Sequence, residues 1–208
     1  MDRSAGDFGE WLDGMRAVLR GEAVADVPCA GCVGCCVSSY PIPLRPGDRT
    51  ALAKVPDRYL QLRRGSGARM LYREDGTCPM LESGRCAIYA DRPQTCRDYD
   101  CRIYAAAGLI PDGPRPVIQD RVREWRFVFA DAAAAGRAAA VRRAAEFIRA
   151  NAHLFPPAAR AHSATAVAVM AVKVHEVFMD DAGLVAPEAR VRAVVDAARC
   201  FDMGGTPA

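Results

Sequence analysis

Cysteine is the residue type in this sequence with the clearest capacity for chemistry. Eight of the nine cysteines lie in the first half of the chain, and Cys200 stands alone near the end. The eight are Cys29, Cys32, Cys35, Cys36, Cys78, Cys86, Cys96 and Cys101. Thiolate sulfur is a soft ligand that suits zinc, iron and iron–sulfur clusters. The clustering therefore predicts metal binding by these eight thiols.

The first four cysteines form the motif C-x2-C-x2-C-C, and its short loops let several thiolates converge at little entropic cost. Gly31 and Gly34 alternate with the thiols and permit the turns that wrapping a metal requires. The other four cysteines must fold back onto this loop. Four plus four thiols suffice for two tetrahedral sites, or for one cluster with spare or redox-active cysteines.

The identity of the metal follows less directly from the spacing. Cys29, Cys32 and Cys35 have the two-residue spacing that wraps an iron–sulfur cube, which a remote cysteine completes. Zinc sites more often combine separated C-x2-C pairs, and the adjacent Cys35 and Cys36 depart from the ferredoxin spacing. We favour an iron–sulfur cluster or iron as the cofactor and keep zinc as the alternative. Disulfides and apolar packing of buried cysteines are the competing explanations.

Composition and charge narrow the possible partners and location. Apolar residues make up 51% and charged residues 25% of the chain, as in ordinary globular proteins. A net charge of +3 is too small to indicate a nucleic-acid or membrane partner. The polar start lacks the apolar stretch of a secretory signal, and the most apolar run, 166–172, is too short to cross a bilayer. We therefore expect a cytoplasmic protein whose partners are metal ions.

The elements that must position the first-half cysteines are predicted to be short. A helix is expected from Phe8 to Leu19, between a capping Asp7 and Gly21. Short strands are expected at 70–72, 78–81 and 86–89, with a hairpin turn at 82–85. Further helical turns are expected after Asp48 and over 57–64.

The predicted hairpin would direct two cysteine side chains to opposite faces. Pairing of Leu81 with Cys86 would place Cys78 and Cys86 on opposite faces, because side chains alternate along a strand. Either a bulge corrects this or the two thiols serve different sites. Cys96 and Cys101 are separated by about 140° around a regular helix. If both thiols face one metal site, a helix that begins near Pro93 must therefore end or distort before Cys101.

The second half of the chain reads as helical. Hydrophobic periodicity predicts a long helix over 118–151 and two more near 158–180 and 187–201. The expected fold class is α+β, in which a cysteine-rich metal-binding region with a short β-hairpin, 27–104, packs against a mainly helical C-terminal region, 117–201. We expect 1–208 to form a single unit.

A known family shares these motifs. They are Cys29-x2-Cys32-x2-Cys35-Cys36, Cys78-Pro79-Met80-Leu81, Gly84-x-Cys86-x-Ile88-Tyr89-x2-Arg92-Pro93-x2-Cys96-Arg97, and Cys101. Over about residues 27 to 104 the chain resembles the CxxCxxCC (YkgJ-like) family of zinc- or iron-chelating cysteine-cluster proteins. The resemblance implies metal or iron–sulfur binding. A related protein type includes flagellin lysine N-methylases, whereas this chain has no recognisable glycine-rich methyl-donor motif.

Three classes of function remain open at this point. We predict a metal-binding protein with a redox or metal-handling role. The alternatives are a metal-dependent enzyme that modifies a protein or peptide, and an interaction module held together by structural zinc. An open coordination position beside Arg92 or Arg97 would favour the enzyme. For Arg92, Arg97 and Tyr89 we expect packing and support of the cysteines instead.

Other polar residues receive structural interpretations. The arginines between 121 and 149 alternate with acidic residues, which indicates a solvated helix face and not a nucleic-acid surface. The three histidines are expected at exposed or simply hydrogen-bonded positions of the helical region. They are His153, His162 and His175.

Overall fold

The structure is a computed structural model that describes residues 2–25, 27, 32–40, 42–63, 67–180 and 186–205. Its helices and small sheets confirm the predicted α+β class. Contacts divide the chain into two compact units. The helical unit contains residues 1–23, 101–114 and 122–208, and the cysteine unit contains residues 24–100 and 115–121. Each unit is described by itself.

The first helix of the helical unit forms where the sequence predicts it. Helix α1 (Phe8–Arg20) begins after Asp7, whose Oδ1 accepts a hydrogen bond from the N–H of Glu10 at 3.0 Å. It ends at Gly21, which has a left-handed φ of 78° that glycine adopts without strain. Its apolar face is buried, with Leu12 fully inaccessible to solvent.

The predicted helix over 118–151 is wrong in its middle. Helix α5 (Pro116–Glu124) gives way to strand β7 (Trp125–Val128), and α6 (Ala132–Ala150) then begins after a new cap. Strand β7 pairs in parallel with β1 (Arg3–Asp7), a pairing that the sequence analysis missed. Aromatic side chains favour a strand here, because Phe127 packs edge-on against Phe8 with ring centroids 5.1 Å apart.

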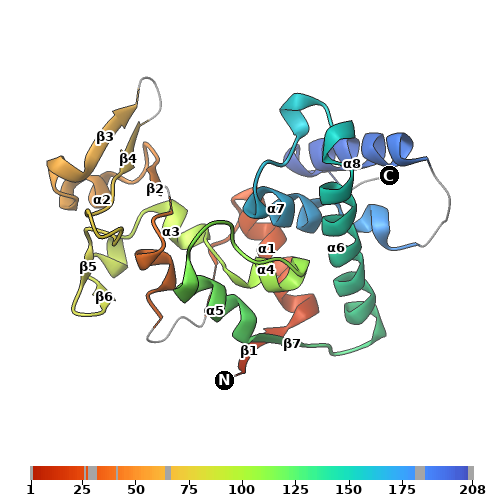
Figure 1. The fold of residues 1–208 in the computed structure, drawn as a ribbon, viewed down its shortest axis with the longest axis horizontal. Helices are drawn as coiled ribbons and strands as arrows, with labels where there is room; N and C mark the ends of the chain where they lie inside the picture. The colour runs from red at the N-terminus through yellow and green to blue at the C-terminus, as the bar shows by residue number, and fades with distance from the viewer. Residues whose placement is uncertain are drawn as a thin grey trace. The chain divides into compact units, whose positions relative to one another are not determined.

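The remaining helices pack around α6 (Figure 1). They are α4 (Arg102–Ala107), η4 (Ala152–Leu154), η5 (Pro157–Ala159), α7 (Ala164–Val174), η6 (His175–Phe178) and α8 (Pro187–Asp202). The helix predicted near 158–180 starts late, because Ser163 caps α7 by accepting from the N–H of Ala166. The helix predicted over 187–201 is confirmed. In the described part of the chain, no helix has the length and apolar character needed to span a membrane.

The cysteine unit contains a three-stranded antiparallel sheet (Figure 1). Its strand order is β2 (Ile42–Leu44), β4 (Gly67–Met70) and β3 (Leu60–Arg63). Strand β3 replaces the second part of the helical turns predicted over 57–64. Gly67 has a φ of +94°, and a Cβ atom there would collide with the carbonyl oxygen of Leu44. A residue without a side chain is therefore required where β2 and β4 meet.

The remaining elements of this unit are short, and three of them carry cysteines. They are η1 (Gly34–Val37), α2 (Arg49–Lys54), η2 (Asp57–Tyr59), β5 (Leu81–Glu82), β6 (Arg85–Cys86), η3 (Tyr89–Asp91) and α3 (Gln94–Asp98). The predicted pairing of Leu81 with Cys86 is confirmed. Because β5 begins only at Leu81, strand alternation does not fix the direction of Cys78, which removes the predicted conflict. Helix α3 ends before Cys101, as predicted.

Candidate metal centre

The two groups of cysteines in the sequence meet through a backbone hydrogen bond. In η1, the N–H groups of Cys36 and Val37 donate to the carbonyl of Val33 at 2.8 and 3.1 Å, which folds the loop into a tight turn. The N–H of Cys78 then donates to the carbonyl of Cys36 at 2.7 Å. This bond places Cys78 beside the Cys35–Cys36 pair without any contribution from a metal.

Cys86 reaches the same region through the β5–β6 hairpin. The N–H of Ala87 donates to the carbonyl of Met80 at 2.8 Å, which extends the pairing beyond the Leu81–Cys86 pair. Arg73 closes the other side of this turn, because its guanidinium donates to the carbonyls of Pro79 at 2.8 Å and Leu81 at 3.1 Å. The loop that carries Cys78 is therefore fixed at both ends.

Cys96 is positioned by the start of α3. Asp48 does not cap its own helix α2; its Oδ1 accepts from the N–H of Gln94 at 2.7 Å instead. Its Oδ2 accepts from the N–H of Arg45 at 2.7 Å. The hydroxyl of Thr95 donates to the carbonyl of Pro43 at 2.8 Å. These bonds hold the helix that carries Cys96 against the segment around β2.

Four thiols gather on one apolar core as a result, and a fifth lies beside one of them. Cys78 is buried among residues such as Met70, Met80 and Ile88, and three other cysteines pack against this core as partly buried residues. Cys35 is exposed, with its sulfur 4.0 Å from that of Cys36. The five residues, called the thiol cluster below, are Cys35, Cys36, Cys78, Cys86 and Cys96. All five are free thiols, so no disulfide ties them together in the part of the chain that the structure describes.

Electrostatics within the thiol cluster oppose ionisation of most of its members. Burial raises the pKa of Cys78 and Cys86 and raises that of Cys96 to about 12, and neighbouring thiols add to each increase. The hydrogen bond between the adjacent pair raises the pKa of Cys36 and lowers that of Cys35 to about 7. One thiol is thus readily ionised, while the others need a compensating positive charge.

The sulfur-rich segment matches a known domain. The model of one family, described as a "putative zinc- or iron-chelating domain", matches residues 28–112. Residues 28–112 are thus similar to the CxxCxxCC family, and this matched segment is called the CxxCxxCC domain below. Searches of curated proteins and of solved structures found no match. The CxxCxxCC domain includes the whole thiol cluster.

The donors of the CxxCxxCC domain fit a metal in their chemistry, since all five are sulfur. Among the described residues, no three cysteine, histidine, aspartate or glutamate side chains converge closely enough to hold an ion. Zinc–sulfur bonds are about 2.3 Å long, so a bound ion would draw the thiols closer, and metal binding commonly drives such closure. Cys29 and Gly31 lie outside the described residues. The half-buried Cys32 accepts a weak hydrogen bond from the N–H of Gly34 at 3.5 Å.

Tyr72 is a residue of the CxxCxxCC domain that the sequence analysis did not select. It follows β4, packs against the apolar core that carries the thiols, and has a buried hydroxyl oxygen without a hydrogen-bond partner in the described structure. Burial raises its pKa, and Cys78 and Cys96 add to this effect. A buried donor without an acceptor fits a site that is completed by a bound group. Only the three-dimensional arrangement could have indicated this, because the residue lies outside the cysteine motifs.

The arginines of the CxxCxxCC domain have supporting contacts, as expected. Arg97 donates to the carbonyls of Arg92, at 3.1 Å, and Ala90. Arg92 donates to the carbonyl of Tyr89 at 2.9 Å and lies over the Tyr89 ring, 4.1 Å from its centroid. Its charge also helps to lower the pKa of Cys35 and partly opposes the increases at Cys86 and Cys96. Arg92 therefore stabilises negative charge on the thiol cluster.

Cys101 lies at the end of the CxxCxxCC match and belongs to the helical unit. It is buried at the start of α4, and the indole N–H of Trp125 donates to its sulfur at 3.2 Å. Its role as a ligand stays a prediction, as does that of Cys29 and Cys32. The histidines agree with expectation, because His153 and His162 are exposed and His175 contacts a backbone carbonyl.

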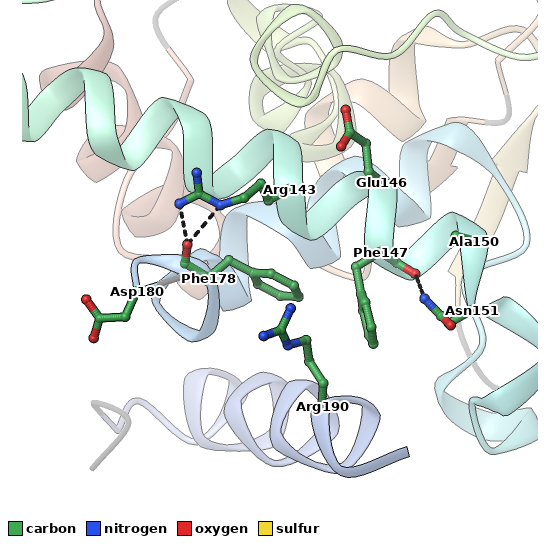
Figure 2. A pocket seen from close by; sticks show the side chains of 8 residues that line it. All are labelled: Arg143, Glu146, Phe147, Ala150, Asn151, Phe178, Asp180 and Arg190. Atoms are coloured by element: carbon green, nitrogen blue, oxygen red, sulfur yellow. Dashed lines mark hydrogen bonds between the residues drawn. The ribbon is translucent and has the colours of Figure 1, made fainter. Parts of the chain in front are cut away.

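A cavity of about 350 Å³ lies in the helical unit, outside the CxxCxxCC domain (Figure 2). The guanidinium of Arg190 lies between the rings of Phe147 and Phe178, 5.8 and 5.6 Å from their centroids. Arg143 donates through Nε and Nη2 to the carbonyl of Phe178 at 3.2 and 2.6 Å. None of the residues that line this cavity is a cysteine or a histidine, so its chemistry differs from that of the thiol cluster.

Proposed function

We propose that the protein binds a metal centre in its CxxCxxCC domain and has a redox or metal-handling role. The observation that carries this proposal is the bond from Cys78 to Cys36, which unites two distant cysteine motifs on one core. We further propose an iron–sulfur cluster or iron as the cofactor, with zinc as the alternative. Cys29, Cys32 and Cys101 complete the proposed set of ligands.

Different residues of the domain would have different roles at such a centre. The apolar core behind Cys78, which includes Met70 and Ile88, excludes water from one side. The exposed thiol of Cys35 leaves the other side open to solvent or to a partner. Arg92 supplies positive charge that favours thiolates over thiols. When bound, an iron–sulfur cluster would supply one-electron transfer, whereas zinc would supply structural cross-linking.

The deciding experiment is metal analysis of the full chain purified without air. We expect iron and acid-labile sulfide, with a broad brown absorption that bleaches on reduction. The variants Cys78→Ser and Cys96→Ser should lose this absorption and most of the metal, whereas the control Cys200→Ser should keep both. Zinc alone would eliminate the iron–sulfur proposal. A chain that retains neither metal, even after reconstitution, would overturn the metal centre itself.

A further inference from the structure

The hydroxyl of Tyr72 lies in an energetically unfavourable environment. Its oxygen is buried, and no hydrogen-bond partner lies within reach in the described residues. A buried polar group without a partner destabilises a fold, because it loses its bonds to water and gains none in return. Such a group in a native protein calls for an explanation, and an acceptor that arrives with a ligand is one.

The surroundings of Tyr72 indicate what kind of acceptor that is. The side chain packs against the same core as Cys36, Cys86 and Cys96. Its phenol group interacts electrostatically with four members of the thiol cluster, first with Cys78 and then with Cys96. The charged groups that act on the hydroxyl are therefore thiols, which makes sulfur the candidate acceptor. The sulfur of a neutral thiol is a weak acceptor, whereas an ionised acceptor forms much stronger hydrogen bonds.

We propose that Tyr72 donates a hydrogen bond to a metal-bound thiolate of the thiol cluster and so determines how tightly the centre holds its metal. This inference rests on the proposed function. A phenol has an ordinary pKa of about 10, so the group carries its proton at neutral pH and acts as a donor. The described structure gives the donor no competing acceptor, so the bond forms without breaking another one.

One substitution at Tyr72 should therefore change metal affinity without changing the stability of the metal-free fold. Because the described residues offer the hydroxyl no hydrogen-bond partner, Tyr72→Phe should leave the thermal midpoint of the metal-free chain unchanged or slightly higher. In the metal-bound protein the same change removes a donor to a ligand. Loss of such a donor typically weakens metal binding by about 10- to 100-fold. If Tyr72 only packed against the core, its substitution would lower the stability of the fold and leave the metal affinity unchanged.

The experiment uses the full chain, prepared without air and without metal, with Zn²⁺ and Co²⁺ as probes. Zinc affinity is measured by competition with a chromophoric chelator, and thermal unfolding of the metal-free chain is followed by circular dichroism. Tyr59→Phe is the matched control, because Tyr59 packs against the same core and also loses one hydroxyl. For Tyr72→Phe we expect zinc affinity about 10- to 100-fold weaker and the cobalt–thiolate absorption at longer wavelength. For Tyr59→Phe we expect neither change.

The remaining outcomes are each decisive. If Tyr72→Phe binds zinc as tightly as the unaltered chain, the role of Tyr72 is wrong while the metal centre stands. If the unaltered chain binds neither Zn²⁺ nor Co²⁺, the centre and the inference both fail. If the metal-free Tyr72→Phe chain does not fold, the hydroxyl is needed for the fold itself, and the inference is overturned.

Discussion

The amide of Cys78 and the carbonyl of Cys36 are joined by a hydrogen bond of 2.7 Å. Because the bond is between backbone atoms, it does not depend on the ionisation of either thiol. Two cysteine motifs that are far apart in the sequence are thus brought together by the fold. Part of the entropy needed to close the intervening loop is therefore lost on folding and not on metal binding.

Arg92 should control how metal uptake depends on pH. The hydrogen bond with Cys36 and, to a smaller extent, the charge of Arg92 lower the pKa of Cys35 to about 7, and metals bind thiolates and not thiols. Arg92→Gln should therefore weaken zinc binding near pH 6.5, with a smaller loss at pH 8.5, where the Cys35 thiol is ionised with or without Arg92. The measurement is zinc competition at both pH values.

Arg85→Gln is the control for this experiment, because Arg85 is exposed on the hairpin that carries Cys86. Arg92 also donates to the carbonyl of Tyr89, so its loss has a structural component as well. An equal loss of affinity at the two pH values would assign the effect to that contact and contradict the electrostatic explanation.

Asp48 should support Cys96 from a distance. Its carboxylate accepts from the N–H groups of Gln94 and Arg45, so Asp48→Ala removes two bonds to a charged acceptor. We expect a loss of about 1–3 kcal/mol in the unfolding free energy of the cysteine unit. Hydrogen exchange should show faster opening of α3. Asp57→Ala, at an exposed position of η2, should change neither quantity, and unchanged exchange in Asp48→Ala would contradict the proposed tether.

Gly67 and Gly14 should respond in opposite ways to the same substitution. Gly67→Ala places a Cβ against the carbonyl of Leu44 at a positive φ, and should cost about 1–3 kcal/mol or more. Gly14 lies within α1 with open space around it, so Gly14→Ala should stabilise the protein by about 0.5–1 kcal/mol. Urea unfolding measures both. A stable Gly67→Ala chain would show that β2 and β4 do not need this close approach.

His175 should make the helical unit sensitive to acid. Burial lowers its pKa below the ordinary value of 6.5, and the nearby charge of Arg16 acts in the same direction. The hydrogen bond with the carbonyl of Val172 opposes this shift, and Glu176 opposes it more weakly. The unfolded chain therefore takes up a proton near pH 6.5, whereas the folded chain does so only at lower pH. The contribution to stability is full above pH 6.5 and is lost as the pH falls through the interval between the two pKa values.

The variant His175→Gln tests this pH dependence. Its urea midpoint should change less between pH 7.5 and pH 5.5 than that of the unaltered chain, while the exposed His153→Gln serves as the control. Both tryptophans, Trp11 and Trp125, lie in the helical unit, so fluorescence reports on its unfolding. An identical pH dependence for the unaltered chain and His175→Gln would exclude His175 as the acid-sensitive group.

Local signals made part of the fold predictable. Asp7 and Gly21 marked the ends of α1, and the turn between Leu81 and Cys86 fixed the hairpin register. Strands β1 and β7 were not predictable, because neither alternates clearly and each is stabilised by a partner far away in the sequence. The periodicity of a helix continued through Trp125, and tertiary pairing overrode it.

The candidate site was likewise only partly predictable from the sequence. The sequence motif correctly indicated that cysteines from two stretches would meet, and five of the eight do so in the thiol cluster. The roles of Tyr72 and Asp48 could not be predicted, because each depends on a neighbour brought close only by folding. Asp48 resembles a helix cap in sequence, yet its carboxylate binds the start of another helix.

The pairing of β1 with β7 has a consequence for the order of events during synthesis. The strand at the beginning of the chain must remain without its partner until residues 125–128 have left the ribosome. All members of the thiol cluster, the last of which is Cys96, emerge earlier. Under the proposed function, a nascent chain can therefore bind its metal before β1 and β7 have paired.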